Sequence, residues 1–436
     1  MTSSSEVTTH NDDHNPRARR AGAFSSHRRP VPVQDDISDL RRILVIVALS
    51  VGAFGIGVTE FVAMGLLPYI ADAFGRDEDA AGRMISMYAL GVVVGAPVIT
   101  VLTGSIPRRR MLLLLMAAFT IGNGATVWAG TLGSFEAVMV SRFIAGLPHG
   151  AYFSVAALVA ASLAKPGQRG KMVALSGVGL SVATVIGVPA AQVLGQMYGW
   201  RSAFAFVAVI GLIALVSLWF AVPHMNRMPK TRPMDELSAL VTPQVLLTVA
   251  IGTVGFGGMF AVYTYITWTM TREAGMSEDH IWIVLMAYGI GMVVGTYIGG
   301  WLSDRIGEWG IMVALVLMVI MLSAFYFTSQ NAVLGTINFL LIGLLGSVLV
   351  PNLQTRLMDV AGRAQTLAAA LNQAALNMAN AFGAALGGWV IASGYGYRAP
   401  ALGGATLAML AIFIALPTIV LYRRSQAKKS GRIELR

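Results

Sequence analysis

The sequence predicts an all-α integral membrane protein with twelve transmembrane helices in two six-helix halves. Hydrophobic residues make up 56% of the 436 residues and charged residues 12%, whereas soluble domains average about 45–50% and 25%. Twelve stretches reach the length of about twenty apolar residues that a helix needs to cross a hydrocarbon core. The two sets of six also resemble each other, because Gly91 and Gly95 recur as Gly291 and Gly295, at a spacing of 200 residues.

Each predicted span is an apolar run bounded by charged residues or by a glycine- or proline-containing turn. Residues 1–40 precede the spans, lack a hydrophobic period and are expected to be disordered. The first half, residues 41–222, contains spans at 43–72, 80–104, 111–130, 134–164, 172–197 and 201–222. A polar linker, 223–244, leads to the second half, residues 245–422, with spans at 245–271, 280–303, 310–328, 331–358, 364–392 and 399–421. A basic tail, 423–436, follows.

The charged loops predict the orientation of these spans. Basic residues gather in alternate connections, as at Arg108-Arg109-Arg110, while two of the opposite loops are acidic, at residues 77–79 and 278–279. Cytoplasmic loops carry an excess of lysine and arginine, so both termini are expected in the cytoplasm. Loop charge also accounts for the net charge of +10, and no nucleic-acid partner is predicted. The absence of cysteine excludes disulfides and thiol chemistry.

Glu60 is the only charged residue between Ile43 and Ala71, in the first span. A charged group in the membrane interior costs about 2.5–3.5 kcal/mol or more, and such residues are usually functional. Arg142 lies eight residues inside the fourth span and needs an acceptor, and His149 follows one heptad later. Helix rise places Glu60 about 26 Å, His149 about 22 Å and Arg142 about 33 Å from the cytoplasmic helix ends. The three side chains are candidates for proton coupling. The alternative is that Arg142 only holds helices together and that His149 is a packing residue whose hydrogen bonds are satisfied.

Further polar side chains occur on two spans of the second half. Tyr263 and Trp268 lie on span seven, and Asn377 and Asn380 belong to a row of amides on span eleven. Within a bilayer these groups must face protein or water. They are candidates to line a substrate cavity, and the alternative is that they hydrogen-bond neighbouring helices, at about 1 kcal/mol or less per bond.

Three motifs give the chain a resemblance to a known family. They are Thr59-Glu60-Phe61 with Met64-Gly65-Leu66-Leu67-Pro68, Arg142-Phe143-Ile144-Ala145-Gly146, and Gly187-Val188-Pro189 with Gly195. Together they resemble the major facilitator superfamily, in particular its twelve-span drug:proton antiporters of the sugar-efflux and chloramphenicol-efflux type. The resemblance implies that spans one, four, seven and ten line a cavity and that Gly187, Pro189 and Gly195 form an antiporter motif. The alternative for that motif is a packing seam of small residues with a proline kink.

The resemblance also implies a charged cytoplasmic latch between spans two and three of each half. The first copy departs from the family pattern, with Gly104 and Pro107, and keeps basic residues such as Arg108. The second copy retains Asp304 and Arg305. We therefore expect the latch at Arg108, Asp304 and Arg305, and the alternative is that these charges anchor helix ends at the interface.

The predicted function is secondary active transport in the cytoplasmic (inner) membrane of a bacterium, as proton-coupled efflux of small organic molecules such as drugs or sugars by alternating access. The expected partners are the substrate, protons and the lipid bilayer, and the expected state is a monomer. No nucleotide-binding motif or spacing of metal ligands is found, so no cofactor, metal site or enzyme activity is predicted. Proton-independent transport, uptake, a channel and a non-transporting membrane sensor are the alternatives.

Overall fold

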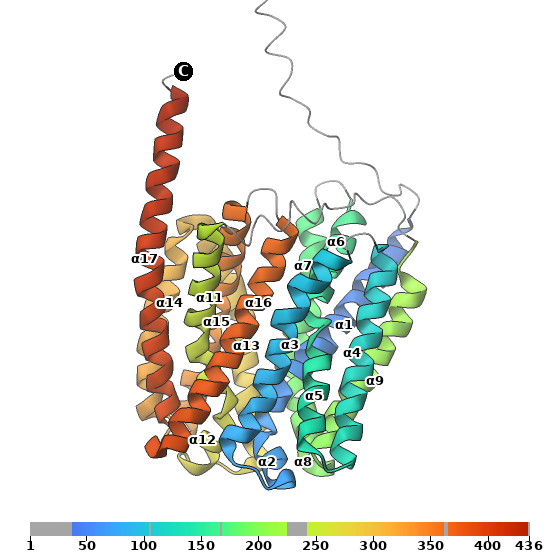
Figure 1. Cartoon of the computed structure of the whole chain (residues 1–436), viewed down its shortest axis with the longest axis vertical. Coiled ribbons are helices and arrows are strands. Elements are labelled where there is room, and N and C mark those ends of the chain that lie inside the picture. The colour runs from blue at the N-terminus through green and yellow to red at the C-terminus, as the bar shows by residue number, and fades with distance from the viewer. Residues whose placement is uncertain (1–36, 104–105, 166–167, 225–241, 362–364, 435–436) are drawn as a thin grey trace, which may run out of the picture. The chain divides into compact units, whose positions relative to one another are not determined.

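The computed structural model describes residues 37–103, 106–165, 168–224, 242–361 and 365–434 (Figure 1). The described residues from Ser38 onward form one compact unit, and all regular structure described in it is helical. Most of the predicted N-terminal tail, at residues 1–36, and most of the predicted linker, at residues 225–241, lie outside the described residues.

Six membrane-crossing segments make up the first half. In chain order its elements are α1 (Asp39–Gly65), α2 (Leu67–Phe74), α3 (Glu78–Leu102), α4 (Arg108–Thr131), α5 (Phe135–Gly146), α6 (His149–Ser162), α7 (Arg169–Val182), the π-helical turn η1 (Ala183–Gly187), α8 (Val188–Tyr198) and α9 (Trp200–Ala221). Side chains at helix starts explain several of these bounds. Ser38, Asp77 and Ser134 each accept a hydrogen bond from the backbone N–H three residues later, which satisfies an N–H that has no partner inside the helix.

The second half repeats this order. Its elements are α11 (Pro243–Thr264), α12 (Ile266–Arg272), the 3₁₀ turn η3 (Glu278–His280), α13 (Ile281–Ile306), α14 (Trp309–Thr328), α15 (Ala332–Ala361), α16 (Gln365–Val390), the π-helical turn η4 (Ile391–Tyr395) and α17 (Ala399–Glu434). Twelve helical segments of the described chain are long and apolar enough to cross a membrane, which confirms the predicted fold class. Helix α17 continues to Glu434, through most of the stretch predicted as a C-terminal tail.

The two halves share a packing framework. A Cβ built on Gly91 of α3 would lie 2.2 Å from the Phe143 carbonyl oxygen of α5, and one on Gly291 of α13 would lie 2.1 Å from the Leu340 carbonyl oxygen of α15. These approaches are too close for any side chain, so glycine is required at both places. Equivalent positions differ by 200 residues between α3 and α13 and by 197 between α5 and α15. The helices α1 and α11 are interrupted at Leu66 and Tyr265, so equivalent positions in them differ by 199 residues.

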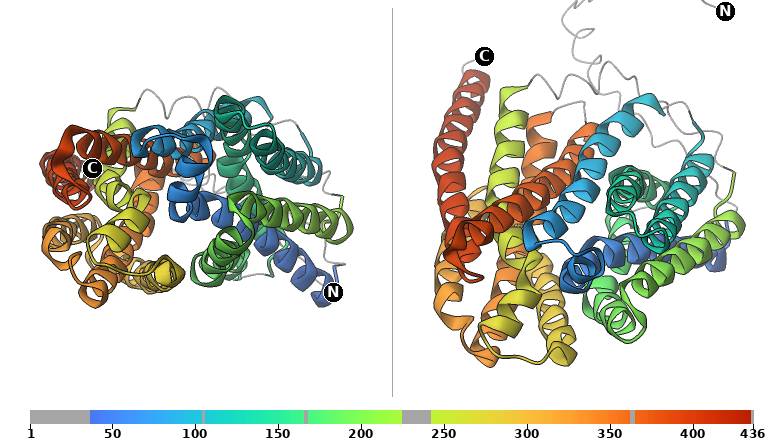
Figure 2. Two further views of the ribbon diagram at one scale, coloured as in Figure 1. Left: turned by 90° about the horizontal axis from the view of Figure 1, so that it is seen from below. Right: turned by 60° about the horizontal axis from the view of Figure 1, so that its bottom comes forward.

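Helices α3 and α16 meet where the halves join. Figure 2 shows the helices of the first half, coloured blue to green, on one side and those of the second half, yellow to red, on the other. The Ser86 hydroxyl donates to the Ala381 carbonyl oxygen at 3.2 Å, and Ala96 belongs to one buried apolar cluster with Leu367 and Leu371. These contacts place the middle and the later part of α3 against the opposite half.

The small residues of α7 and η1 pack against α1. A Cβ on Gly179 would lie 1.8 Å from the Ser50 carbonyl oxygen, and one on Gly187 would lie 2.6 Å from Val58 Cγ2. The π-helical turn ends one residue before Val188-Pro189. The predicted motif therefore brings a neighbouring helix into close contact with the helix that carries Glu60.

Candidate functional site

Glu60 lies on α1 with 8% of its surface exposed. Its Oε2 is 3.9 Å from Nε2 of His149. His149 is the first residue of α6 because the fourth span breaks at Leu147-Pro148, between α5 and α6. The structure thus brings together two of the three predicted proton-coupling residues, from the first and fourth spans.

Arg142 is completely buried on α5 and binds the residue that precedes Glu60. Its Nη1 donates to the Thr59 hydroxyl at 2.9 Å, and its Nη2 donates to the Thr59 carbonyl oxygen at 3.1 Å. The Thr59 hydroxyl in turn donates to Asn123 Oδ1 of α4 at 2.6 Å. Among the described residues, no ion pair joins Arg142 to Glu60. Arg142 is therefore attached to the helix of the acid, and not to the acid itself.

Tyr88 of α3 links the two parts of this site. Its hydroxyl is 3.0 Å from Nδ1 of His149, and the Arg142 guanidinium carbon lies 4.3 Å from the centre of its ring. A Tyr88 hydroxyl that donates to Nδ1 leaves the proton of the neutral imidazole on Nε2, the nitrogen that faces Glu60. Four side chains from three spans thus form one continuous polar cluster: Glu60, His149, Tyr88 and Arg142.

Aromatic residues of the second half face this cluster. The rings of Phe61 and Tyr263 are 5.5 Å apart, and Tyr263 lies 4.5 Å from Tyr288 of α13. The predicted cavity residue Tyr263 therefore lies beside Phe61, the residue that follows the acid, where α11 meets α1.

Trp268, predicted together with Tyr263, lies beyond the break between α11 and α12. Its ring stacks on that of Tyr265 at 6.0 Å. The preceding residue, Thr267, donates to the Gly65 carbonyl oxygen at 2.9 Å, and Gly65 is about 7.5 Å along the helix from Glu60. Trp268 is thus level with the end of α1 and separate from Tyr263.

The amides of α16 are buried and incompletely bonded. Asn377 Nδ2 donates to the Gln373 carbonyl oxygen at 3.1 Å, but its Oδ1 and both amide atoms of Asn380 have no partner among the described residues. Gln373 lies on the same face, and its Cβ is 3.6 Å from the position that a Cβ on Gly150 would take, next to His149. The row of amides thus begins beside the polar cluster and has capacity to bind a further group.

Polar contacts also tie the halves together at the acidic end, which we define by Tyr69, Glu78, Arg272, Glu278 and Tyr397. Arg272 and Tyr397 both bind Glu78, the latter at 2.5 Å. In the mirrored contact, Tyr69 donates to Glu278 at 2.7 Å. Burial is the main cause, and the hydrogen bond to Glu78 the second, that raises the pKa of Tyr397 to about 12. Burial also raises the pKa of Tyr69. Both phenols therefore stay protonated and act as donors.

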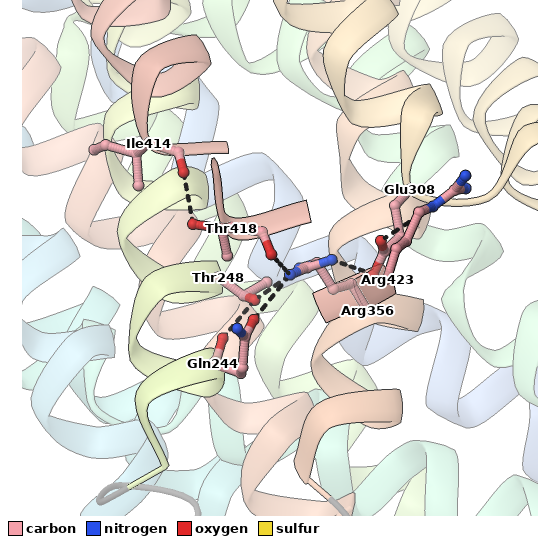
Figure 3. A network of polar contacts seen from close by, with 7 residues as sticks. All are labelled: Gln244, Thr248, Glu308, Arg356, Ile414, Thr418 and Arg423. Atoms are coloured by element: carbon pink, nitrogen blue, oxygen red, sulfur yellow. Dashed lines mark hydrogen bonds and ion pairs between the residues drawn. The ribbon is translucent and has the colours of Figure 1, made fainter. Parts of the chain in front are cut away.

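The basic end, which we define by Arg108, Arg305, Glu308 and Arg356, is the region of the predicted latch. The Arg305 guanidinium lies 4.8 Å from the centre of the Trp301 ring, Arg108 begins α4, and the Asp304 side chain is outside the described residues. Ion pairs described in this region join Glu308 to Arg356 of α15 and to Arg423 of α17 (Figure 3). These contacts lie within the second half.

Arg356 is almost completely buried and connects several helices of that half. Its Nε donates to the Thr248 hydroxyl at 3.1 Å and its Nη2 to Gln244 Oε1 at 3.0 Å, as Figure 3 shows. Burial raises the pKa of Glu308 and outweighs the opposing effect of Arg356. The network thus holds α11, α15 and the α13–α14 connection together.

Sequence reasoning missed Thr59, Asn123, Tyr88 and Tyr288 as members of the site. The first two are ordinary polar residues inside spans, and only the rotation of α1 and α4 brings them to Arg142. A signal for the tyrosines was present, because Tyr88 and Tyr288 are 200 residues apart and occupy the same place in the two repeated stretches.

Comparisons with known proteins agree with this architecture. A family model described as Major Facilitator Superfamily matches residues 49–364 and 256–435. The inner membrane transport protein YdhP of Escherichia coli (strain K12) is 38% identical over 369 residues, which are 85% of this chain and 94% of that protein. A chloramphenicol resistance protein of Streptomyces lividans is 32% identical over 373 residues, 85% of this chain and 94% of that protein.

Two solved structures share the fold. A D-xylose-proton symporter matches with a TM-score of 0.69 at 17% identity, covering 86% of this chain and 97% of that chain. A bacterial homolog of the human lysosomal transporter Spinster, in an inward-facing and unoccupied conformation, matches with a TM-score of 0.68 at 15% identity, covering 88% of this chain and 98% of that chain.

Proposed function

The chain belongs to the major facilitator superfamily of secondary transporters, and from that premise we propose that it exports small organic molecules in exchange for protons. The observation that carries the proposal is the buried carboxyl group of Glu60, which lies 3.9 Å from His149 on a helix whose next residue, Phe61, packs against Tyr263 of the second half. It is the group best placed to bind both a proton and a solute.

A carboxylate in this position needs compensation, because a charge in an apolar interior is costly. Protonation removes the charge. When Glu60 is deprotonated, its charge is compensated by water, by the His149 N–H or by a polar group of the solute. Proton binding from one side of the membrane and solute binding from the other then compete for Glu60. Such competition couples the two movements in opposite directions.

Arg142 has a positioning role in this proposal. Its bonds to Thr59 fix the rotation of α1, while its charge lies over the Tyr88 ring.

Movement of the halves requires the Glu78 and Glu278 contacts of the acidic end to separate. The exposed Arg272–Glu78 ion pair among them is worth only about 0.2–1 kcal/mol, and each of the two hydrogen bonds from a tyrosine to a glutamate is worth about 1.5–3 kcal/mol. Proton binding therefore offsets part of the cost of separating them.

The driving force sets a scale for the transport. One proton that crosses about 100 mV releases about 2.3 kcal/mol, which sustains about a forty-fold gradient of a neutral solute when coupling is tight. The Streptomyces lividans relative named for chloramphenicol resistance supports drugs as one solute class. Sugars remain the other proposed class.

The protein works as a monomer in the bacterial inner membrane, with both termini and the basic end in the cytoplasm. Asn377, Asn380, Tyr263 and Trp268 line the solute pathway. The Gly187-Pro189-Gly195 seam permits movement against α1, and Arg108, Asp304 and Arg305 close the cytoplasmic side.

The test is transport by the purified full-length chain in lipid vesicles with an imposed pH gradient. We expect labelled solute from a panel of chloramphenicol, sugars and nucleosides to move against its own gradient, opposite to the proton flow. Glu60→Gln should abolish this uphill movement and keep solute exchange without a gradient. Glu136→Gln, which changes an exposed acid paired with Arg76 at 3.1 Å, is the matched control.

Two outcomes would contradict the proposal. Uphill movement by Glu60→Gln with an unchanged dependence on pH would show that the proton acts elsewhere. Solute movement in the same direction as the protons would indicate uptake.

A further inference from the structure

Tyr288 occupies in the second half the position that Tyr88 occupies in the first. Both tyrosines are 1% exposed and lie 200 residues apart on α3 and α13. A Cβ on Gly146 would lie 2.2 Å from the Tyr88 carbonyl oxygen, and one on Gly343 would lie 2.8 Å from the Tyr288 carbonyl oxygen. The backbone around the two residues is therefore built in the same way.

The partners of the two hydroxyl groups differ. The Tyr88 hydroxyl contacts His149, whereas the 197-residue offset between α5–α6 and α15 places Gly346 at the equivalent position. Glu60 corresponds to Met259 through the offset of 199, and a Cβ on Gly346 would lie 2.2 Å from the sulfur of Met259. The acid and imidazole of the first half are thus replaced by a methionine packed over a glycine.

This replacement leaves the Tyr288 hydroxyl buried and without a hydrogen-bond partner among the described residues. Buried polar groups are nearly always bonded in native proteins, so an unbonded hydroxyl requires an explanation. Its neighbours are rings, with Tyr263 at 4.5 Å and Phe339 at 4.6 Å. Phe339 occupies the position that corresponds to Arg142 in the first half. Neither the acid nor the arginine of the first half is therefore repeated around Tyr288.

We propose that the Tyr288 hydroxyl of the second half binds a hydroxyl or amide group of the transported solute. Its ligand is an uncharged solute in which such a group adjoins an apolar ring or chain, because the surrounding side chains are aromatic rings and a thioether. The rings of Phe61 and Tyr263 pack against the apolar part. This inference rests on the proposed function and adds the solute-binding group contributed by the second half.

The variant is Tyr288→Phe in the full-length protein. The matched control is Tyr152→Phe, which removes a buried hydroxyl that already donates to the Leu49 carbonyl oxygen at 2.8 Å. In thermal unfolding without solute, we expect Tyr152→Phe to lower the Tm and Tyr288→Phe to leave it unchanged or raise it. Removal of a bonded group costs stability, while removal of an unbonded one does not.

Transport in vesicles then tests the solute contact. The probes are the solutes of the panel that the wild type moves, each with its set of single-deoxy analogues, beginning with chloramphenicol and 3-deoxychloramphenicol. For the parent solute, Tyr288→Phe should raise KM about two- to tenfold, the value of one hydrogen bond, with kcat changed less. For the analogue that lacks the bound hydroxyl, the wild type and the variant should have the same KM.

The outcomes separate this inference from the function on which it rests. A Tm lowered as much as in Tyr152→Phe, or an equal loss for parent and every analogue, shows a structural role and overturns the inference. A wild type that exports solute in exchange for protons, while Tyr288→Phe matches it in KM, also overturns the inference and leaves the proposed function standing. A wild type that moves no solute removes both.

Discussion

Replacing Thr59 by valine removes the hydroxyl that joins Arg142 to α1 and α4 while keeping the shape of the side chain. Two hydrogen bonds disappear, one from the Arg142 guanidinium at 2.9 Å and one to Asn123 at 2.6 Å. Values from soluble proteins give about 1.5–3 kcal/mol for the charged bond and 0.5–1.5 kcal/mol for the neutral one. Bonds in membrane proteins average about 0.6 kcal/mol and reach about 1.7 kcal/mol. We therefore expect a loss of about 1–3 kcal/mol in the free energy of unfolding.

The assay is equilibrium unfolding in detergent, followed by the fluorescence of the 8 tryptophans. The matched control is Thr264→Val, because Thr264 is equally buried on α11 and donates to the Phe260 carbonyl oxygen of its own helix at 2.8 Å. We expect the control to lose no more than about 0.6 kcal/mol. Equal losses for the two variants would refute the view that the Thr59 hydroxyl holds Arg142.

Two further predictions concern packing and pH. Gly146→Ala should lower the free energy of unfolding by about 1–3 kcal/mol, because the new Cβ would lie 2.2 Å from the Tyr88 carbonyl oxygen. The control is Gly124→Ala, which should cost no stability because no atom lies within 4 Å of its Cβ. Similar losses for the two variants in thermal unfolding would contradict this. Because burial raises the pKa of Glu308 above its ordinary value of 4.5, the unfolded chain loses this proton at lower pH than the folded chain, and the group's contribution to stability falls as pH rises from about 4.5 through the raised pKa. Glu308→Gln should remove that part of the slope in unfolding measured between about pH 4 and pH 8, and an unchanged slope would show that another group causes it.

The fold could be predicted from the sequence because its signals are residue types and their spacing along the chain. Length and apolar composition define each span, and the repeated glycines define the halves, since each marks a backbone approach that no other residue allows. Those signals need no knowledge of how a helix is rotated.

The site could be predicted only in part, because side-chain partners depend on helix rotation. Helix rise correctly placed Glu60 and His149 at a similar depth, and they lie 3.9 Å apart. The acceptor of Arg142 is Thr59, the neighbour of Glu60, and adjacent residues on a helix point about 100° apart. A break at Tyr265 likewise separates Trp268 from Tyr263. Apolar composition does not reveal either the rotation or the break.

The shared framework of the two halves has an evolutionary consequence. The glycine and carbonyl contacts that hold α3 on α5 and α13 on α15 are the same, yet the charged set that includes Glu60, Arg142 and His149 exists in one copy alone. A duplicated gene whose copies kept one scaffold could thus specialise, one for ion chemistry and the other for solute fit. Under the proposals made above, substitutions around Tyr288 and Met259 would alter the range of solutes while leaving the proposed proton-coupling residues of the first half intact.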